Sequence, residues 1–171
     1  MSIKRVTLLY VIAFIMQLSF INLISIGGIG PNLILCLTVV IIFKYENGFR
    51  CIPFGIAACL LLDICVGSYV GPASLAIFAT GIAVTWVRIY LNTDLYKTMA
   101  SVGAAATLLY GIVSWIILAI LQTNYSFIYM LRYQIFFMIY NVLIMAAIFF
   151  FMSDRFARWR NSHRRNKEEE I

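Results

Sequence analysis

Long apolar runs separated by short polar connections make up most of the chain. Uncharged stretches of about twenty residues recur, at 6–30, 64–87 and 133–153, and connections such as "GGIG" and "VGSYV" are brief. A helix needs about 20 mostly apolar residues to cross a hydrocarbon core of about 30 Å. The pattern therefore predicts an all-α, polytopic membrane protein rather than a soluble domain.

Six segments qualify as membrane-spanning helices, at residues 6–26, 31–43, 51–66, 71–89, 99–122 and 133–152. The second is short, because its 13 residues reach only about 20 Å at about 1.5 Å each. It is either re-entrant or a short span that thins the bilayer locally or packs against protein. Pro31 is expected in the first turn of this helix, where its missing N–H removes no hydrogen bond.

The basic residues favour six crossings. With six crossings, one side of the membrane receives both ends of the chain and the basic residues of two connections: Lys4, Arg5, Lys44, Arg50, Arg88 and Lys97. Arg132 is then the only basic residue on the other side. Because positive segments stay cytoplasmic, we expect both termini inside, with a six-helix transmembrane domain at 1–153 and a basic tail at 154–171.

The composition supports this class. The chain is 63% hydrophobic and 12% charged, whereas soluble domains are about 45–50% apolar and about 25% charged. The first segment is expected to be a retained span rather than a cleaved signal peptide.

The tail carries many of the cations behind the net charge of +6, including Arg155, Arg158, Arg160, Arg164 and Arg165. Because a basic segment next to a membrane is attracted to anionic headgroups, we expect this tail to contact lipid and not nucleic acid. Docking of a cytoplasmic partner is the remaining alternative.

Residues for catalysis or metal binding are not assembled in the sequence. The predicted spans hold one aspartate, Asp63, and the single histidine, His163, lies in the tail. The four cysteines lack metal-ligand spacing, so we expect them to serve as small packing residues: Cys36, Cys51, Cys59 and Cys65. The sequence therefore indicates a protein that is not an enzyme and holds no cofactor or metal.

Asp63 is the main candidate for function, because "LLLDICVG" places a carboxylate in an apolar run. An aspartate at a helix centre costs about 2.5–3.5 kcal/mol, so it needs a partner. Depth counts from the helix ends predict an intramembrane polar cluster of Asp63 with some of Gln134, Asn141, Gln17 and Arg132. Asp63 either joins helices and caps the turn at 67–72, or forms a substrate, proton or partner site.

Small residues recur in the fifth segment, where Gly103, Thr107 and Gly111 are four residues apart. Such a face lets another helix approach closely. We expect it to pack inside the bundle, with a seam for a partner subunit as the alternative.

Residues 31–78, "PNLILCLTVVIIFKYENGFRCIPFGIAACLLLDICVGSYVGPASLAIF", resemble the signature half of the MreD family of bacterial rod shape-determining membrane proteins. The family pattern has a proline before a short apolar helix, then a Gly-rich helix that ends in an aspartate, then a Gly-containing turn. The matching positions are Pro31, Asn32, Gly55, Asp63, Gly67 and Gly71. Cys59 departs from the pattern, where a glycine is common, and so does Asn32, where an aspartate is usual.

The resemblance implies a non-enzymatic scaffold of the cell-wall elongation machinery in the bacterial cytoplasmic membrane. Its expected partners are MreC, the MreB filament, the RodA polymerase and its class B penicillin-binding protein. The short second helix and the Gly55 face are then expected seams for the MreC transmembrane helix.

The same resemblance implies a six-helix fold similar to the substrate-binding component of energy-coupling-factor transporters. This keeps open an alternative function, in which the chain binds a small ligand of the vitamin type in an outward pocket near Asp63. A proton-coupled transporter is a third alternative. It needs a relay of acidic residues, whereas the predicted spans hold a single carboxylate.

Overall fold

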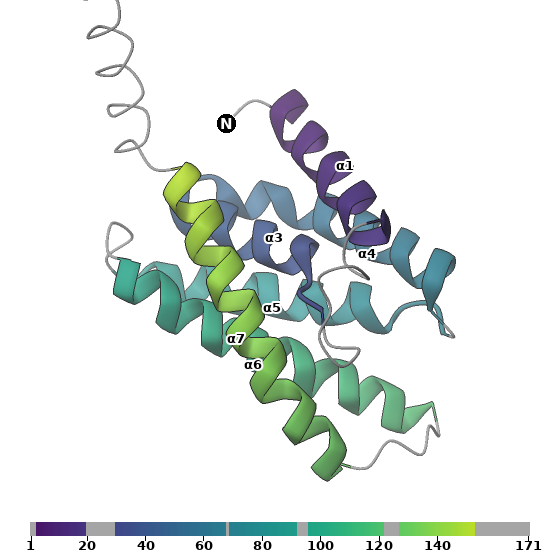
Figure 1. Ribbon diagram of the computed structural model, residues 1–171. Helices are drawn as coiled ribbons and strands as arrows, with labels where there is room; N and C mark the ends of the chain where they lie inside the picture. The colour runs from purple at the N-terminus through teal and green to yellow at the C-terminus, as the bar shows by residue number, and fades with distance from the viewer. Residues whose placement is uncertain (1–2, 20–29, 68, 92–95, 122–126, 153–171) are drawn as a thin grey trace, which may run out of the picture.

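The structure is a computed structural model that describes residues 3–19, 30–67, 69–91, 96–121 and 127–152. These residues contain no strand, and they form one short 3-10 helix, η1 (Gly48–Cys51), and six α-helices: α1 (Ile3–Ser19), α3 (Leu33–Lys44), α4 (Ile52–Val66), α5 (Pro72–Arg88), α6 (Tyr96–Ile120) and α7 (Phe127–Phe151). The helices pack as one bundle (Figure 1). Each one matches a segment expected from the sequence.

The short helix α3 is the centre of this bundle. Every residue from Ile34 to Phe43 is buried, and α1, α4, α5, α6 and α7 all contact α3 (Figure 1). A helix that is apolar on every side is stable only where every side is covered. The structure shows the short second segment packed against protein along its whole buried length.

The start of α3 corrects one expectation. Helix α3 begins at Leu33 with Asn32 as its N-cap, so Pro31 lies before the cap and not in the first turn. Prolines do occupy the first turns of α4 and α5, where their fixed φ suits the helix and no hydrogen bond is lost.

Three helices are long and apolar enough to cross a membrane, at Gly48–Val66, Tyr96–Ile120 and Leu131–Phe151. Helices α3 and α5 are apolar but shorter. Large apolar side chains are exposed on the outer faces of α6 and α7, for example Ile112, Ile116 and Leu143. Such faces suit contact with lipid and indicate a membrane protein.

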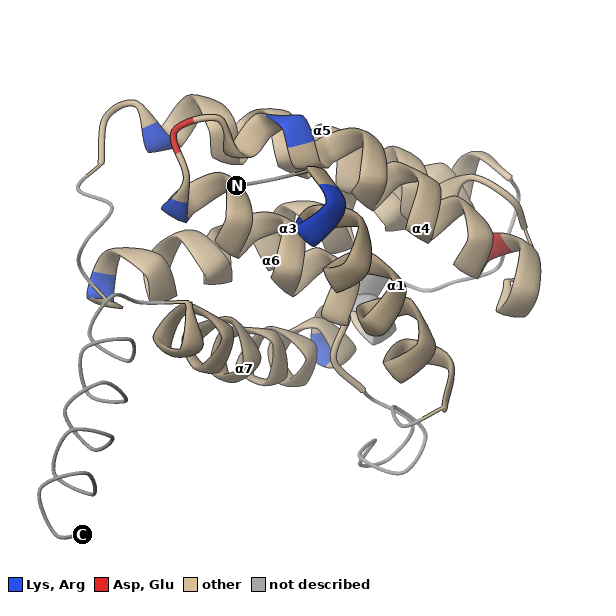
Figure 2. Ribbon diagram, turned by 90° about the horizontal axis from the view of Figure 1, so that it is seen from above, with Lys and Arg blue, Asp and Glu red and all other residues tan. Residues whose placement is uncertain are grey.

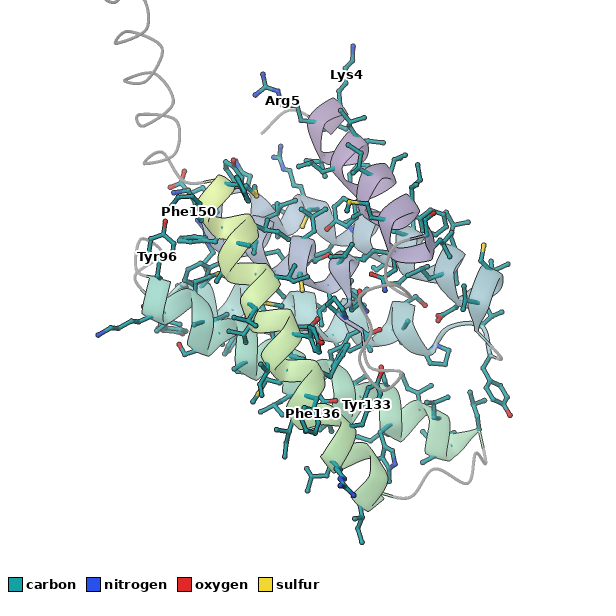
Figure 3. All side chains as sticks on the ribbon, in the orientation of Figure 1. Lys4, Arg5, Tyr96, Tyr133, Phe136 and Phe150 are labelled. Atoms are coloured by element: carbon teal, nitrogen blue, oxygen red, sulfur yellow. The ribbon has the colours of Figure 1, made fainter. Side chains whose placement is uncertain are left out.

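Basic side chains gather toward one end of the bundle (Figure 2). Arg88, at the end of α5, donates from Nε to the carbonyl of Phe43 (3.1 Å) and from Nη1 to that of Glu46 (2.9 Å). The Lys44 ammonium lies 5.7 Å from the centre of the Phe149 ring. Lys4 and Arg5 point away from the bundle at the start of α1 (Figure 3). These contacts bring the ends of α3, α5 and α7 together.

Candidate functional site

Asp63 lies near the end of α4 and holds the start of α5. Its Oδ2 accepts hydrogen bonds from the backbone N–H groups of Gly71 (3.0 Å), Ala73 (3.2 Å) and Ser74 (3.4 Å). The first N–H groups of a helix have no partner within the helix, and the helix dipole favours a negative charge there. The carboxylate is 8% exposed and acts as a cap supplied by the neighbouring helix.

Two glycines shape the turn that makes this contact. The N–H of Gly67 donates to the carbonyl of Asp63 at 3.0 Å, and a Cβ at Gly67 would lie 2.6 Å from that oxygen. Gly71 has a φ of 116°, which other residues adopt only with strain. Gly67 and Gly71 therefore serve the backbone of the turn rather than helix packing.

Asn32 is the centre of a second polar site, at the start of α3. Its Oδ1 accepts from the N–H of Leu35 (3.0 Å), its own N–H donates to Oδ1 of Asn141 (2.8 Å), and its Nδ2 donates to the Tyr110 hydroxyl (3.2 Å). Asn141 comes from α7 and Tyr110 from α6. A single cap residue therefore connects three helices.

Gln17 of α1 completes this site. Its Oε1 accepts from the N–H of Leu33 (2.7 Å) and its Nε2 donates to the carbonyl of Pro31 (3.2 Å). We call Gln17, Asn32, Tyr110 and Asn141 the α3 cap cluster. The cluster supplies acceptors for N–H groups that would otherwise be unpaired in an apolar interior.

The expected single cluster around Asp63 is therefore divided. Gln17 and Asn141 belong to the α3 cap cluster, Gln134 donates from Nε2 to the carbonyl of Thr107 at 2.6 Å, and Arg132 is exposed. The physical reason is that α3 and α5 both begin inside the bundle. The unpaired N–H groups at the start of each helix need their own side-chain acceptors.

The small residues of α6 pack against α7. A Cβ at Gly103 would lie 2.7 Å from Sδ of Met145, and one at Gly111 would overlap the amide of Gln134. Thr107 is fully buried between them. The interpretation as internal packing is the one the structure shows, and this face leaves no seam for a partner subunit.

Gly55 is also covered by side chains of the same chain. A Cβ there would lie 2.8 Å from Oγ1 of Thr38, 3.4 Å from Cδ1 of Ile77 and 3.5 Å from the Tyr10 hydroxyl. Since α3 is buried as well, the chain itself covers both parts of the expected seam for an MreC helix. The close approach there joins α4 to α1, α3 and α5.

The cysteines are free thiols, and three of them pack inside the bundle. Cys36, Cys51 and Cys59 are buried, whereas Cys65 is exposed and does not pack in the core. Within the ranges that the structure describes, no group of three or more His, Cys, Asp and Glu side chains forms a candidate metal site.

Sequence reasoning missed two pairs of residues. Asn32 and Tyr110 were not expected to meet, although an asparagine directly before an apolar helix is a recognised N-cap signal. The hydroxyls of Tyr10 and Thr38 share a buried hydrogen bond of 2.7 Å, and no pattern in the sequence indicates this contact between helices.

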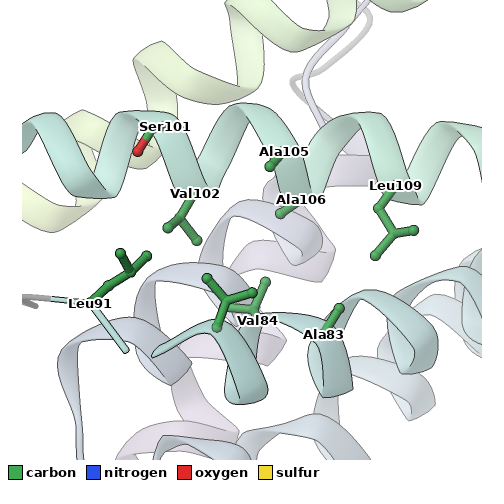
Figure 4. A pocket seen from close by; sticks show the side chains of 9 residues that line it. Ala83, Val84, Leu91, Ser101, Val102, Ala105, Ala106 and Leu109 are labelled. Carbon is green, nitrogen blue, oxygen red and sulfur yellow. The ribbon is translucent and has the colours of Figure 1, made fainter. Parts of the chain in front are cut away.

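An apolar groove of about 320 Å³ lies between α5 and α6 (Figure 4). Small side chains line it from both helices, including Ala83, Ser101, Ala105 and Ala106.

Comparison of the chain with protein-family models, with curated proteins and with solved structures finds no match. The expected lipid-binding arginines, Arg155 to Arg165, lie outside the described residues.

Proposed function

We propose that the chain is a membrane scaffold of the MreD type, which links MreC and the peptidoglycan synthases to the MreB filament. In this proposal six segments cross the bacterial cytoplasmic membrane, with both termini cytoplasmic. In the same proposal the fold is similar to that of the substrate-binding component of energy-coupling-factor transporters, and RodA and its class B penicillin-binding protein are direct or indirect partners.

The capping role of Asp63 is the observation that supports this proposal most. A transport or proton site needs a carboxylate that can exchange partners, whereas Oδ2 of Asp63 accepts from the backbone N–H groups of Gly71, just before α5, and of Ala73 and Ser74 in its first turn. Neither the groove between α5 and α6 nor the cavity near Arg88 is lined by Asp63. The contacts favour a rigid adaptor over the small-ligand binder.

The residues that carry the resemblance have structural roles in the same half of the chain. Asn32 starts α3, Gly55 lets α4 approach α3, and Asp63 with Gly71 positions α5. These structural roles account for the family pattern without a catalytic or ligand-binding role at any of its positions. It supports the idea that residues 31–78 build a fixed surface for other proteins.

The groove between α5 and α6 is the better candidate for MreC, since the chain itself covers α3 and Gly55. Its alanines and serine allow a helix backbone to approach closely, which favours association in a membrane. It is also open, since Ala105 is exposed. A single transmembrane helix of MreC is the occupant that we propose.

Photo-crosslinking tests this placement. A photoreactive amino acid at Ala105 should crosslink to MreC in membranes, and the same residue at Ala147 serves as the control, because Ala147 is an equally small, exposed residue on α7. Crosslinking from Ala147 and not from Ala105 would refute the placement. Crosslinking to MreC from neither position would count against the proposed function.

A further inference from the structure

A second cavity, of about 510 Å³, lies at the basic end of the bundle. It is formed where α1, α3, η1, α4 and α5 meet, around the connection that follows α3. Neither the resemblance nor the proposed scaffold function assigns a role to it.

Cations outnumber anions in the lining of this cavity. Lys44, Arg50 and Arg88 line it together with a single carboxylate, Glu46. Within the described ranges, no ion pair joins Glu46 to any of these three cations, and Glu46 is exposed. Three positive charges around one hollow leave a net positive potential that attracts an anion.

Contacts within the protein hold two of these cations in place. Arg88 is fixed by its hydrogen bonds to the carbonyls of Phe43 and Glu46, and Lys44 is held over the Phe149 ring. Fixed cations bind an anion with a smaller loss of side-chain entropy than free ones. Arg50 is exposed, and its guanidinium carbon lies 6.0 Å from the centre of the Phe49 ring.

Apolar side chains also line the cavity. They include Val6 of α1, Ile41 of α3 and Phe54 of α4, and Asn47 adds an amide to the lining. A hollow lined by both cations and apolar side chains matches a molecule with an anionic head and a hydrocarbon tail. Guanidinium and ammonium groups are the side chains that proteins use for phosphate.

We propose that this cavity binds a phosphate group, with Lys44 and Arg50 as its main recognition residues. The apolar lining favours a phospholipid headgroup as the source, and a free phosphate is the other source with the same chemistry. The proposal does not depend on the scaffold function.

Binding to the full-length chain in detergent tests the proposal, with three probes: phosphatidylglycerol, phosphatidylcholine and inorganic phosphate. Native mass spectrometry should show a preference for phosphatidylglycerol over phosphatidylcholine. Each charge removed should weaken binding about fivefold, so Lys44→Gln/Arg50→Gln should weaken it roughly 25-fold. Arg88 is left intact because it holds the connection after α3.

The matched control is Lys97→Gln/Arg132→Gln, which also removes two charges, here from two exposed residues that do not line the cavity. Arg50→Gln alone covers the case in which the double variant does not fold, and should weaken binding about fivefold. Loss of inorganic phosphate binding in the same variants, without a lipid preference, would support the site with a free phosphate as its ligand. Equal binding by Lys44→Gln/Arg50→Gln and the control would overturn the proposal.

Discussion

Oδ1 of Asn141 accepts a hydrogen bond from the backbone N–H of Asn32 at 2.8 Å, which joins α7 to the N-cap of the central helix. Asn141 is fully buried, and 109 residues separate the two along the chain. In an apolar interior this bond fixes the position of α7 against α3.

Asn141→Ala should lower the free energy of unfolding by about 1–3 kcal/mol, because the N–H of Asn32 loses its buried acceptor. Tyr110→Phe is the control, since it removes only the hydroxyl that accepts from Nδ2 of Asn32, and should cost about 1 kcal/mol. Unfolding in mixed detergent micelles measures both. Equal losses in the two variants would show that the Asn141 contact stabilises the fold no more than the Tyr110 contact does.

Substitutions of Asp63 separate hydrogen bonding from charge. Asp63→Leu leaves three N–H groups at the start of α5, including that of its N-cap Gly71, without their acceptor and should cost about 1–3 kcal/mol. Asp63→Asn keeps a side-chain oxygen, which caps a helix nearly as well, and should cost about 1 kcal/mol or less. Cell-shape complementation should follow the same order. If Asp63→Asn were as damaging as Asp63→Leu while unfolding was unchanged, the charge itself would be required and a transport site would regain support.

Gly111→Ala should lower the free energy of unfolding because the new methyl group displaces the Gln134 amide from the carbonyl of Thr107. Gly103→Ala should cost less, since its methyl group meets the flexible end of Met145. Thermal unfolding in detergent measures the difference.

The specific control is Gly111→Ala in a Gln134→Ala background. There the cost should fall by about 1 kcal/mol, which is a typical coupling energy for residues in contact. An unchanged cost would mean that the methyl group disturbs something other than Gln134.

The proposed topology predicts which connections a membrane-impermeant maleimide reaches. In a background with Cys65→Ser, Tyr69→Cys should be labelled in intact cells and Asn47→Cys only after permeabilisation, because basic connections stay cytoplasmic. Both positions are exposed. The reverse labelling would show that the bundle has the opposite orientation in the membrane. Labelling of both positions in intact cells would rule out six crossings.

The helices were predictable because each is an apolar run, short in α3 and longer in the others, that ends at a polar or glycine-containing connection. The segments expected at 51–66 and 71–89 correspond to α4 (Ile52–Val66) and α5 (Pro72–Arg88). The cap of α5 by Asp63 was among the stated alternatives, since an aspartate close to a glycine turn can reach the next helix. Internal packing of Gly103, Thr107 and Gly111 was also the favoured interpretation.

The pairing of polar residues was not predictable in the same way. Depth along a helix follows from counting residues, whereas the direction in which a side chain points depends on how each helix is rotated against its neighbours. Gln134 and Asn141 lie seven residues apart on one helix, yet one contacts α6 and the other α3. The burial of Gly55 beneath α1 and α5 likewise depends on packing, which the sequence does not specify.

Co-purification from membranes tests the scaffold proposal most directly. The full-length chain, solubilised under mild conditions, should retain MreC and MreB, and Ala105→Leu should reduce the MreC recovered while Ala147→Leu does not. Recovery of a stoichiometric small molecule in place of MreC, equally from the wild type and Ala105→Leu, would contradict the account.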